Sequence, residues 1–234
     1  VNAIYELTEG QVIAIDGKTL RRSHDRFLGR EAIQMVSAWA QENHLVLAQV
    51  KVDSKSNEIT AIPQLLKILG LEDSIVTIDA IGCQREHTET IVERGGDYVL
   101  AVKGNQDHLH EDVQALFEEI EHPDIDFIEH DYYETIEKDH GRIETRRCWT
   151  LYDEDCLDYV RNREGWKGLR TLAMVESVRK IGEKETKEVR YYISSLPGNA
   201  ERILSAVRSH WGIENSLHWV LDVAFREDDS RLRK

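Results

Sequence analysis

Two aspartates each follow a short apolar run with the composition of a buried strand. Asp16 comes directly after residues 12–15, and Asp79 comes directly after residues 75–78. We expect both aspartates at strand ends, where loops gather and ligands bind. If the two strands are parallel neighbours, their carboxylates lie close together and repel each other unless a cation lies between them. Either aspartate alone is as readily explained as a turn former or a helix cap. The matching pair points more specifically to a hard divalent ion such as Mg²⁺.

A glutamate near the end of the chain lies within a helical pattern. Apolar residues recur at helical spacing over residues 200–223, and Glu214 falls on the same stripe as Leu217. We therefore expect Glu214 to point inward, with His210 and His218 one turn to either side. Because a buried glutamate needs a partner, it is either bonded to one of these histidines or a third metal ligand.

Basic and amide side chains near these elements could hold the phosphates of a nucleic acid. They are Lys18, Arg21, Arg22, Lys55, Asn57, Lys103, Asn105 and Arg142, with Arg208, His210 and Asn215 in the last helical segment. Each of them alone is more commonly a solvated surface group. Lys103 is the strongest candidate, because it follows a predicted strand at the same sheet end as the aspartates.

The elements that must position these residues alternate between strand and helix. The predicted strands are residues 12–16, 33–40, 45–52, 75–79 and 98–102, and the predicted helices are residues 57–70, 84–94 and 106–120. The first three strands can form an antiparallel meander, and the later strand–helix units favour parallel pairing. We therefore expect an α/β fold with a mixed five-stranded sheet and flanking helices.

The pattern changes after this core. Residues 125–197 indicate four strands joined by short turns, with Gly182 in a hairpin, and residues 198–234 carry the last helix. We expect residues 1–124 to form the first part of a core, residues 125–197 a β-rich insertion, and residues 198–234 a helix that completes the core.

Composition favours a cored globule and complicates the choice of partner. The 234 residues are 41% hydrophobic and 32% charged, and the net charge of −14 argues against binding nucleic acid. Much of the acidity lies in residues 111–140, however, whereas residues 16–30 are rich in Lys and Arg. Three scattered cysteines favour a reducing cytosol, and no apolar run is long enough to span a membrane. We therefore expect a cytoplasmic protein.

Several stretches together resemble a known family. They are residues 14–23 (AIDGKTLRRS), 55–66 (KSNEITAIPQLL), 77–84 (TIDAIGCQ), 95–106 (GGDYVLAVKGNQ), 140–146 (HGRIETR) and 210–231 (HWGIENSLHWVLDVAFREDDSR). The chain is similar to insertion-sequence transposases of the DDE type, the family that includes the H-repeat-associated proteins. The resemblance implies a ribonuclease H-like core with a β-rich insertion before the last catalytic helix.

The resemblance also implies a reaction and its residues. Asp16, Asp79 and Glu214 match the catalytic triad, which holds two Mg²⁺ ions, for which Mn²⁺ can substitute. The activity would be cleavage and strand transfer on double-stranded DNA, at element ends and target, by a homodimer in the DNA complex. The resemblance further implies a protein of the bacterial cytosol that is associated with the nucleoid. Family members carry additional N-terminal sequence, so part of terminal-repeat recognition is expected outside this chain.

One part of the last helix departs from related DDE families. They place Tyr and Arg before the catalytic Glu and Lys after it, whereas this chain has Val207 and His210 before Glu214 and no Lys at the expected spacing.

Two alternatives stay open: a ribonuclease H-like nuclease that cuts without joining, and a domesticated or inactive remnant that binds DNA or protein. The acidic residues 111–140 would serve the remnant as a protein-binding surface or form a solvated face.

Overall fold

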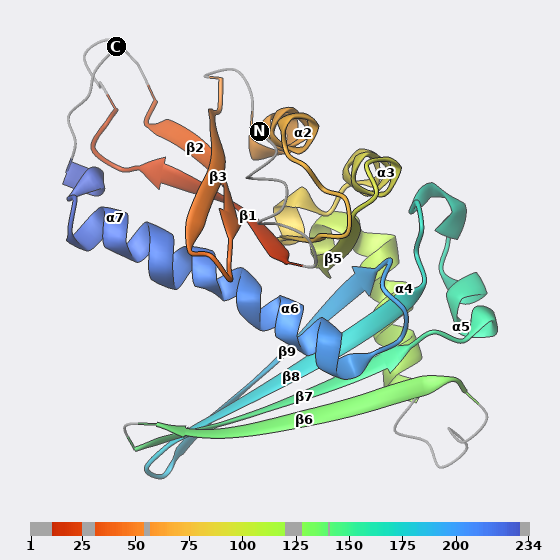
Figure 1. The fold of residues 1–234 in the computed structure, drawn as a ribbon. Helices are drawn as coiled ribbons and strands as arrows, with labels where there is room; N and C mark the ends of the chain where they lie inside the picture. Colours follow the sequence, from red (N-terminus) through yellow and green to blue (C-terminus); the bar gives the residue numbers. More distant parts are fainter. Residues whose placement is uncertain (1–10, 25–30, 54–56, 120–127, 140, 230–234) are drawn as a thin grey trace. The chain divides into compact units, whose positions relative to one another are not determined.

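The computed structural model describes residues 11–24, 31–53, 57–119, 128–139 and 141–229 (Figure 1). The chain divides into two compact units, one formed by Val1–Asp97 with Val207–Lys234 and the other by Tyr98–Ala206. None of the helices within the described ranges is long and apolar enough to cross a membrane.

The first unit contains a four-stranded mixed sheet. Its strands are β1 (Val12–Leu20), β2 (Ile33–Ala40), β3 (Leu45–Lys51) and β4 (Ile75–Ile78), in the order β3-β2-β1-β4. The first three strands form the predicted antiparallel meander, and β1 pairs with β4 in parallel. The predicted strand boundaries agree with the structure to within one residue except at Asp16, because β1 continues to Leu20 along its pairing with β2.

Two helices and a short 3-10 turn follow the strands of this unit. They are α2 (Glu58–Ile68), η1 (Ala80–Gly82) and α3 (Arg85–Glu93), and α2 packs against β2, β3 and α3. The helix predicted over residues 57–70 ends at Ile68, with Leu69 as its C-cap in an extended conformation. Gly95 follows the C-cap of α3, with a φ of +77° that favours glycine.

The alternation of side chains along β1 assigns its two faces to different partners. Ala14 packs with Ile213 and Leu217 of the last helical segment. Gly17 faces the other way, since a Cβ there would lie 2.7 Å from Oε2 of Glu58 in α2. Even-numbered residues of β1 therefore face the last helical segment, and odd-numbered residues face α2.

The last helical segment changes its pitch part of the way along. It begins as α6 (Ala200–Gly212), continues as a π-helix, η5 (Ile213–His218), and ends as α7 (Trp219–Val223) before a short 3-10 turn, η6 (Glu227–Asp229). The single predicted helix is thus confirmed in extent, while its 3.6-residue periodicity is interrupted by the wider π turn.

The second unit is an antiparallel sheet with helices beside it. Its strands are β5 (Asp97–Val102), β6 (His130–Asp139), β7 (Arg142–Leu151), β8 (Thr171–Ile181) and β9 (Lys184–Ser194), in the order β5-β9-β8-β7-β6. The remaining elements are η2 (Gly104–Gln106), α4 (Asp107–Glu119), α5 (Glu154–Tyr159) and η4 (Arg163–Gly165). Gly182, with a φ of +59°, turns the hairpin between β8 and β9 as predicted.

The prediction of a five-stranded sheet is wrong in its count. The described residues form nine strands, because the four strands expected in a separate insertion add to the sheet rather than packing apart from it. The addition occurs at β5, where Val99–Val102 pair antiparallel with Tyr191–Ser194 of β9. This pairing satisfies backbone groups that would otherwise form an open edge.

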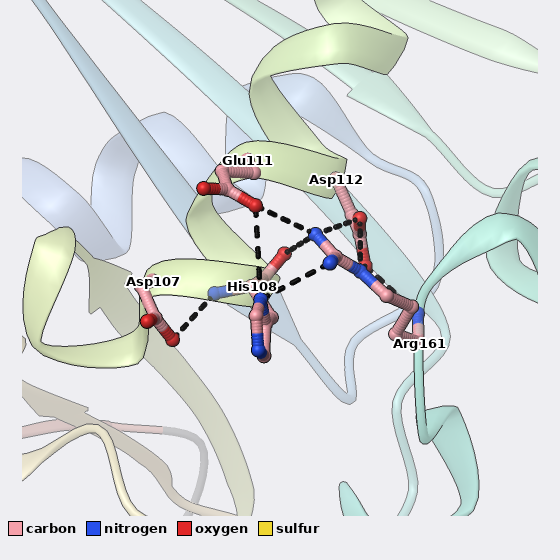
Figure 2. Close-up of polar contacts among 5 residues, drawn as sticks. All are labelled: Asp107, His108, Glu111, Asp112 and Arg161. Carbon is pink, nitrogen blue, oxygen red and sulfur yellow. Dashed lines mark hydrogen bonds and ion pairs between the residues drawn. The ribbon is translucent and has the colours of Figure 1, made fainter.

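Some of the acidic residues in the stretch 111–140 form ion pairs inside the second unit. The side chain of Asp112 is only 7% exposed, and both the backbone N–H and the Nε–H of Arg161 donate to it at 2.8 Å. Arg161 also donates to Glu111 at 2.9 Å and to the carbonyl of His108 at 3.1 Å, as Figure 2 shows. These contacts hold α4 to the segment after α5.

Further acidic residues of the same stretch are bonded in the sheet and to α6. Glu134 and Glu137 of β6 pair with Arg147 and Arg146 of β7 at 2.5 and 3.0 Å. Asp131 accepts the backbone N–H of Ala200 at the start of α6. Neither a purely solvated face nor a free protein-binding surface therefore describes this part of the acidic segment.

Removing the buried carboxylate tests this account. We expect Asp112→Ala to lower the free energy of unfolding by about 3 kcal/mol, because the backbone N–H of Arg161 loses a buried charged acceptor. Urea unfolding measures the difference. Arg163→Gln is the matched control: its partners Glu154 and Asp158 are more than 70% exposed, so its effect should stay below about 1 kcal/mol. Equal losses in both variants would contradict a structural role for the buried pair.

Candidate active site

The register of β1 and β4 places the two aspartates on adjacent strands at the same level. Parallel pairing runs from Val12 opposite Ile75 to Ile15 opposite Ile78, so Asp16 and Asp79 are the next residue on each strand. The expectation that the two strands are parallel neighbours is confirmed. The expectation that Asp16 ends its strand is wrong, because β1 continues beside β2 after the ladder to β4 has stopped.

Asp79 also caps the turn that follows β4. Its Oδ1 accepts the backbone N–H of Ile81 at 3.1 Å and that of Gly82 at 3.3 Å, at the start of η1. The helix-cap interpretation of this aspartate is therefore confirmed. It does not compete with a ligand role, because the cap fixes the carboxylate at the end of β4 and engages Oδ1.

Asp16 lies in a field of like charges. Its pKa is raised to about 7, chiefly by burial; the carboxylates of Asp79, Glu214 and Glu58 also raise the pKa, and the backbone N–H of Gly17 lowers it. All four acidic residues belong to the first unit. Like charges this close to a buried carboxylate are the electrostatic condition that a bound cation relieves.

Glu214 does not point into the core, contrary to the prediction from helical spacing. The residue is exposed, while Ile213 and Leu217 are the buried members of the π-helix. The wider π turn explains the error, because it shifts the buried face by one residue relative to an uninterrupted α-helix. Glu214 is thus a solvent-accessible carboxylate that acts on Asp16 electrostatically.

Glu58 is a fourth carboxylate that the sequence reasoning missed. It is the first residue of α2, and its carboxylate lies over Gly17, where a Cβ would overlap it. Burial and the charge of Asp79 raise the pKa of Glu58. An acidic residue in the first turn of a helix is ordinary, so the sequence offered no reason to single it out.

His218 also lies beside Asp16, a contact that helical spacing alone could not establish. Its Nδ1 lies 3.4 Å from Oδ2 of Asp16. Burial, and secondarily the charge of Lys18, lowers the pKa of His218 to about 4, so the imidazole is neutral at pH 7. Its Nε2 is buried and has no hydrogen-bond partner among the residues that the structure describes.

The basic residues after Asp16 are paired inside the first unit. Lys18 is 9% exposed; its Nζ donates to the carbonyl of His218 at 3.2 Å and forms ion pairs with Asp222 and, at 3.7 Å, with Glu227. The next two basic residues pair with η6 at the surface, Arg21 with Asp228 at 3.4 Å and Arg22 with Asp229 at 3.2 Å. A DNA phosphate would have to displace these carboxylates.

The other candidates for DNA contact are divided between the units. In the first unit Asn57, Arg208 and Asn215 are exposed, and Nδ1 of His210 lies 3.0 Å from Oγ1 of Thr77. Lys55 lies outside the described residues. In the second unit Lys103 and Asn105 are exposed, and Arg142 pairs with Glu144 at 2.9 Å.

The donor set fits a divalent cation in type. Asp16, Asp79, Glu58 and Glu214 offer only carboxylate oxygens, which Mg²⁺ prefers, and Gly17 leaves the space that the Glu58 carboxylate occupies. Within the described ranges no three His, Cys, Asp or Glu side chains are gathered closely enough to hold an ion. Binding of a divalent cation by these carboxylates would therefore require their side chains to move closer together.

The raised pKa of Asp16 gives a pH dependence with a definite sign. Between pH 4 and 7 the unfolded chain releases this proton before the folded protein does, so the stability of the metal-free protein falls as pH rises through this range. We expect Asp16→Asn to be more stable than the wild type at pH 8, by about 4 kcal/mol at most, and to match it near pH 4.

Urea unfolding in the presence of a chelator measures this difference. Asp79→Asn is the matched variant: it removes a charge that raises the pKa of Asp16, so the loss of stability with rising pH should be smaller than in the wild type and complete at a lower pH. Equal stability of wild type and Asp16→Asn at pH 8 would show that Asp16 is not held among like charges.

A solved structure with some likeness to this chain is DesVI from Streptomyces venezuelae. It is 14% identical, with a TM-score of 0.24, and the match covers 61% of this chain and 51% of that one. Likeness at this level carries no argument about fold or activity.

Sequence relatives give a consistent family. The "H repeat-associated putative transposase YhhI" of Escherichia coli K12 is 45% identical over 230 residues, which cover 95% of this chain and 59% of that protein. The "Putative transposase YncI" of Escherichia coli O157:H7 is 46% identical over 235 residues, covering 98% of this chain and 58% of that protein. The chain thus spans about three fifths of the length of these relatives. The family model described as "Transposase DDE domain" matches residues 7–234, so this chain belongs to the transposase DDE domain family.

Proposed function

We propose that this chain is the catalytic domain of a DNA transposase that cleaves and joins phosphodiester bonds at insertion-sequence ends. Asp16, Asp79 and Glu214 would hold the divalent ions. The observation that carries the proposal is the field around Asp16, where the carboxylates of Asp79 and Glu214 raise the pKa of a buried aspartate. Family membership supplies the reaction class.

The topology of the first unit supports a ribonuclease H-like core. An antiparallel meander, β3-β2-β1, is extended by a parallel β4, and the candidate aspartates lie on β1 and directly after β4. Under this proposal Glu214 comes from the last helical segment, which packs on the even-numbered face of β1 through Ile213 and Leu217.

The main role of Asp16, Asp79 and Glu214 would be to hold negatively charged carboxylates where the divalent ions bind. Two Mg²⁺ ions, or Mn²⁺ in their place, when bound, supply activation of a water or 3′-hydroxyl and stabilisation of the leaving oxygen. Asp79 is fixed by its cap to η1, whereas Glu214 is exposed and free to approach Asp16. In the metal-free protein the raised pKa of Asp16 limits the repulsion among these groups by favouring a protonated carboxyl.

Double-stranded DNA would have to be bound by local groups, because the chain as a whole carries a net charge of −14. Asn57, Arg208 and Asn215 are exposed in the unit that carries the triad, and Lys103 and Asn105 are exposed in the other. We assign these five residues to backbone contacts, with a homodimer as the DNA-bound form.

The activity test compares two aspartates that do the same structural work. Asp79 and Asp153 each cap a helix by accepting the backbone N–H groups two and three residues ahead. We expect Asp79→Asn to lower Mg²⁺-dependent nicking of element-end DNA by about 1,000-fold, since each 1.4 kcal/mol of lost transition-state stabilisation is about tenfold. Asp153→Asn should retain nicking, because it alters only a helix cap and the bond from the backbone N–H of Glu129, away from the proposed triad.

A second substrate separates joining from cutting. Pre-cut DNA ends incubated with the wild type and a target plasmid should give strand-transfer products. Nicking without transfer would identify a nuclease that cuts but does not join. Equal nicking by Asp79→Asn and Asp153→Asn would contradict the triad.

A further inference from the structure

We propose that His218 is a positioning residue that orients the carboxylate of Asp16 and docks the segment carrying Glu214 onto β1. The inference rests on the proposed function, because it gives His218 a role toward a residue assigned there to metal binding. The observation behind it is the series of contacts between the even-numbered face of β1 and the last helical segment.

The contacts along β1 follow its even-numbered side chains in order. Ala14 packs against Ile213 and Leu217 at the start of the contact. At its end Lys18 donates to the carbonyl oxygen of His218 at 3.2 Å and pairs with Asp222 one turn further on. Asp16 lies between these two positions, and Nδ1 of His218 lies 3.4 Å from its Oδ2. The same histidine is thus held through its backbone by Lys18 and reaches Asp16 with its ring.

The surroundings of the ring select one tautomer. A neutral imidazole carries a proton on only one of its ring nitrogens. With Asp16 ionised, a proton on Nδ1 faces a carboxylate oxygen. A proton on Nε2 would be buried without an acceptor among the described residues and would turn the Nδ1 lone pair toward the carboxylate. The geometry therefore favours Nδ1–H directed at Asp16.

The same contact links two members of the candidate triad. His218 and Glu214 both belong to the six-residue π-helix η5. Fixing the end of this segment to Asp16 and Lys18 also limits where the backbone of Glu214 can lie. Residues that bond to metal ligands restrict ligand orientation, and their loss commonly weakens metal affinity or activity by about 10- to 100-fold.

The test uses variants that differ in where they present an N–H. His218→Asn places an amide nitrogen near the position of Nδ1, His218→Gln places it near Nε2, and His218→Leu removes it while filling the space. Mn²⁺ affinity, from calorimetric titration of the whole chain, is read together with kcat and KM for nicking of element-end DNA.

We expect His218→Leu and His218→Gln to weaken Mn²⁺ binding and lower kcat by about 10- to 100-fold, with little change in KM for DNA. His218→Asn should restore most of both. If the leucine variant does not fold, the asparagine–glutamine pair still decides the matter, because both are polar and differ chiefly in reach. Equal behaviour of asparagine and glutamine, or wild-type Mn²⁺ affinity in the leucine variant, would overturn the proposal.

Asp16→Asn separates this inference from the function on which it rests. If that variant binds Mn²⁺ and nicks DNA like the wild type, the proposed function fails. If it loses both while His218→Leu retains both, the proposed function stands and only the role of His218 is wrong.

Discussion

The arrangement of the candidate site depends on the parallel register between β1 and β4. Because Ile15 lies opposite Ile78, the next residue on each strand is an aspartate, and both carboxylates emerge at the level where their ladder ends. β1 then continues beside β2 alone, so Asp16 stays within a regular strand while Asp79 turns into η1. Asp79, Glu214 and Glu58 matter to the site because the charge of each of them raises the pKa of Asp16.

The alternation of β1 explains how two separate elements reach the same aspartate. Glu58 approaches from the odd-numbered face, where the absence of a side chain at Gly17 makes room for its carboxylate. His218 approaches from the even-numbered face, between the packing of Ala14 and the ion pair of Lys18. The environment of this carboxylate is therefore set by two elements that are distant from β1 in sequence.

Local patterns predicted most of the elements, because apolar periodicity and glycine punctuation depend on neighbouring residues. They identified the strands β1 and β4, the hairpin at Gly182 and the last helical segment. They failed where the structure depends on distant partners. Glu214 was expected in the core because sequence spacing cannot reveal a π turn, and Glu58 was overlooked because its importance comes from its position over Gly17. Lys18 appeared as a free cation because its partners lie about 200 residues further along.

The pairing of Lys18, Arg21 and Arg22 with acidic residues near the C-terminal end of the described chain bears on how DNA affinity would respond to salt. The salt dependence of DNA binding reflects counterions released as protein cations neutralise phosphates. A phosphate that binds one of these three residues exchanges with a protein carboxylate. The freed carboxylate then gathers cations of its own, which offsets the release from the DNA. The logarithm of affinity should therefore fall less steeply with the logarithm of salt concentration than a count of basic residues implies.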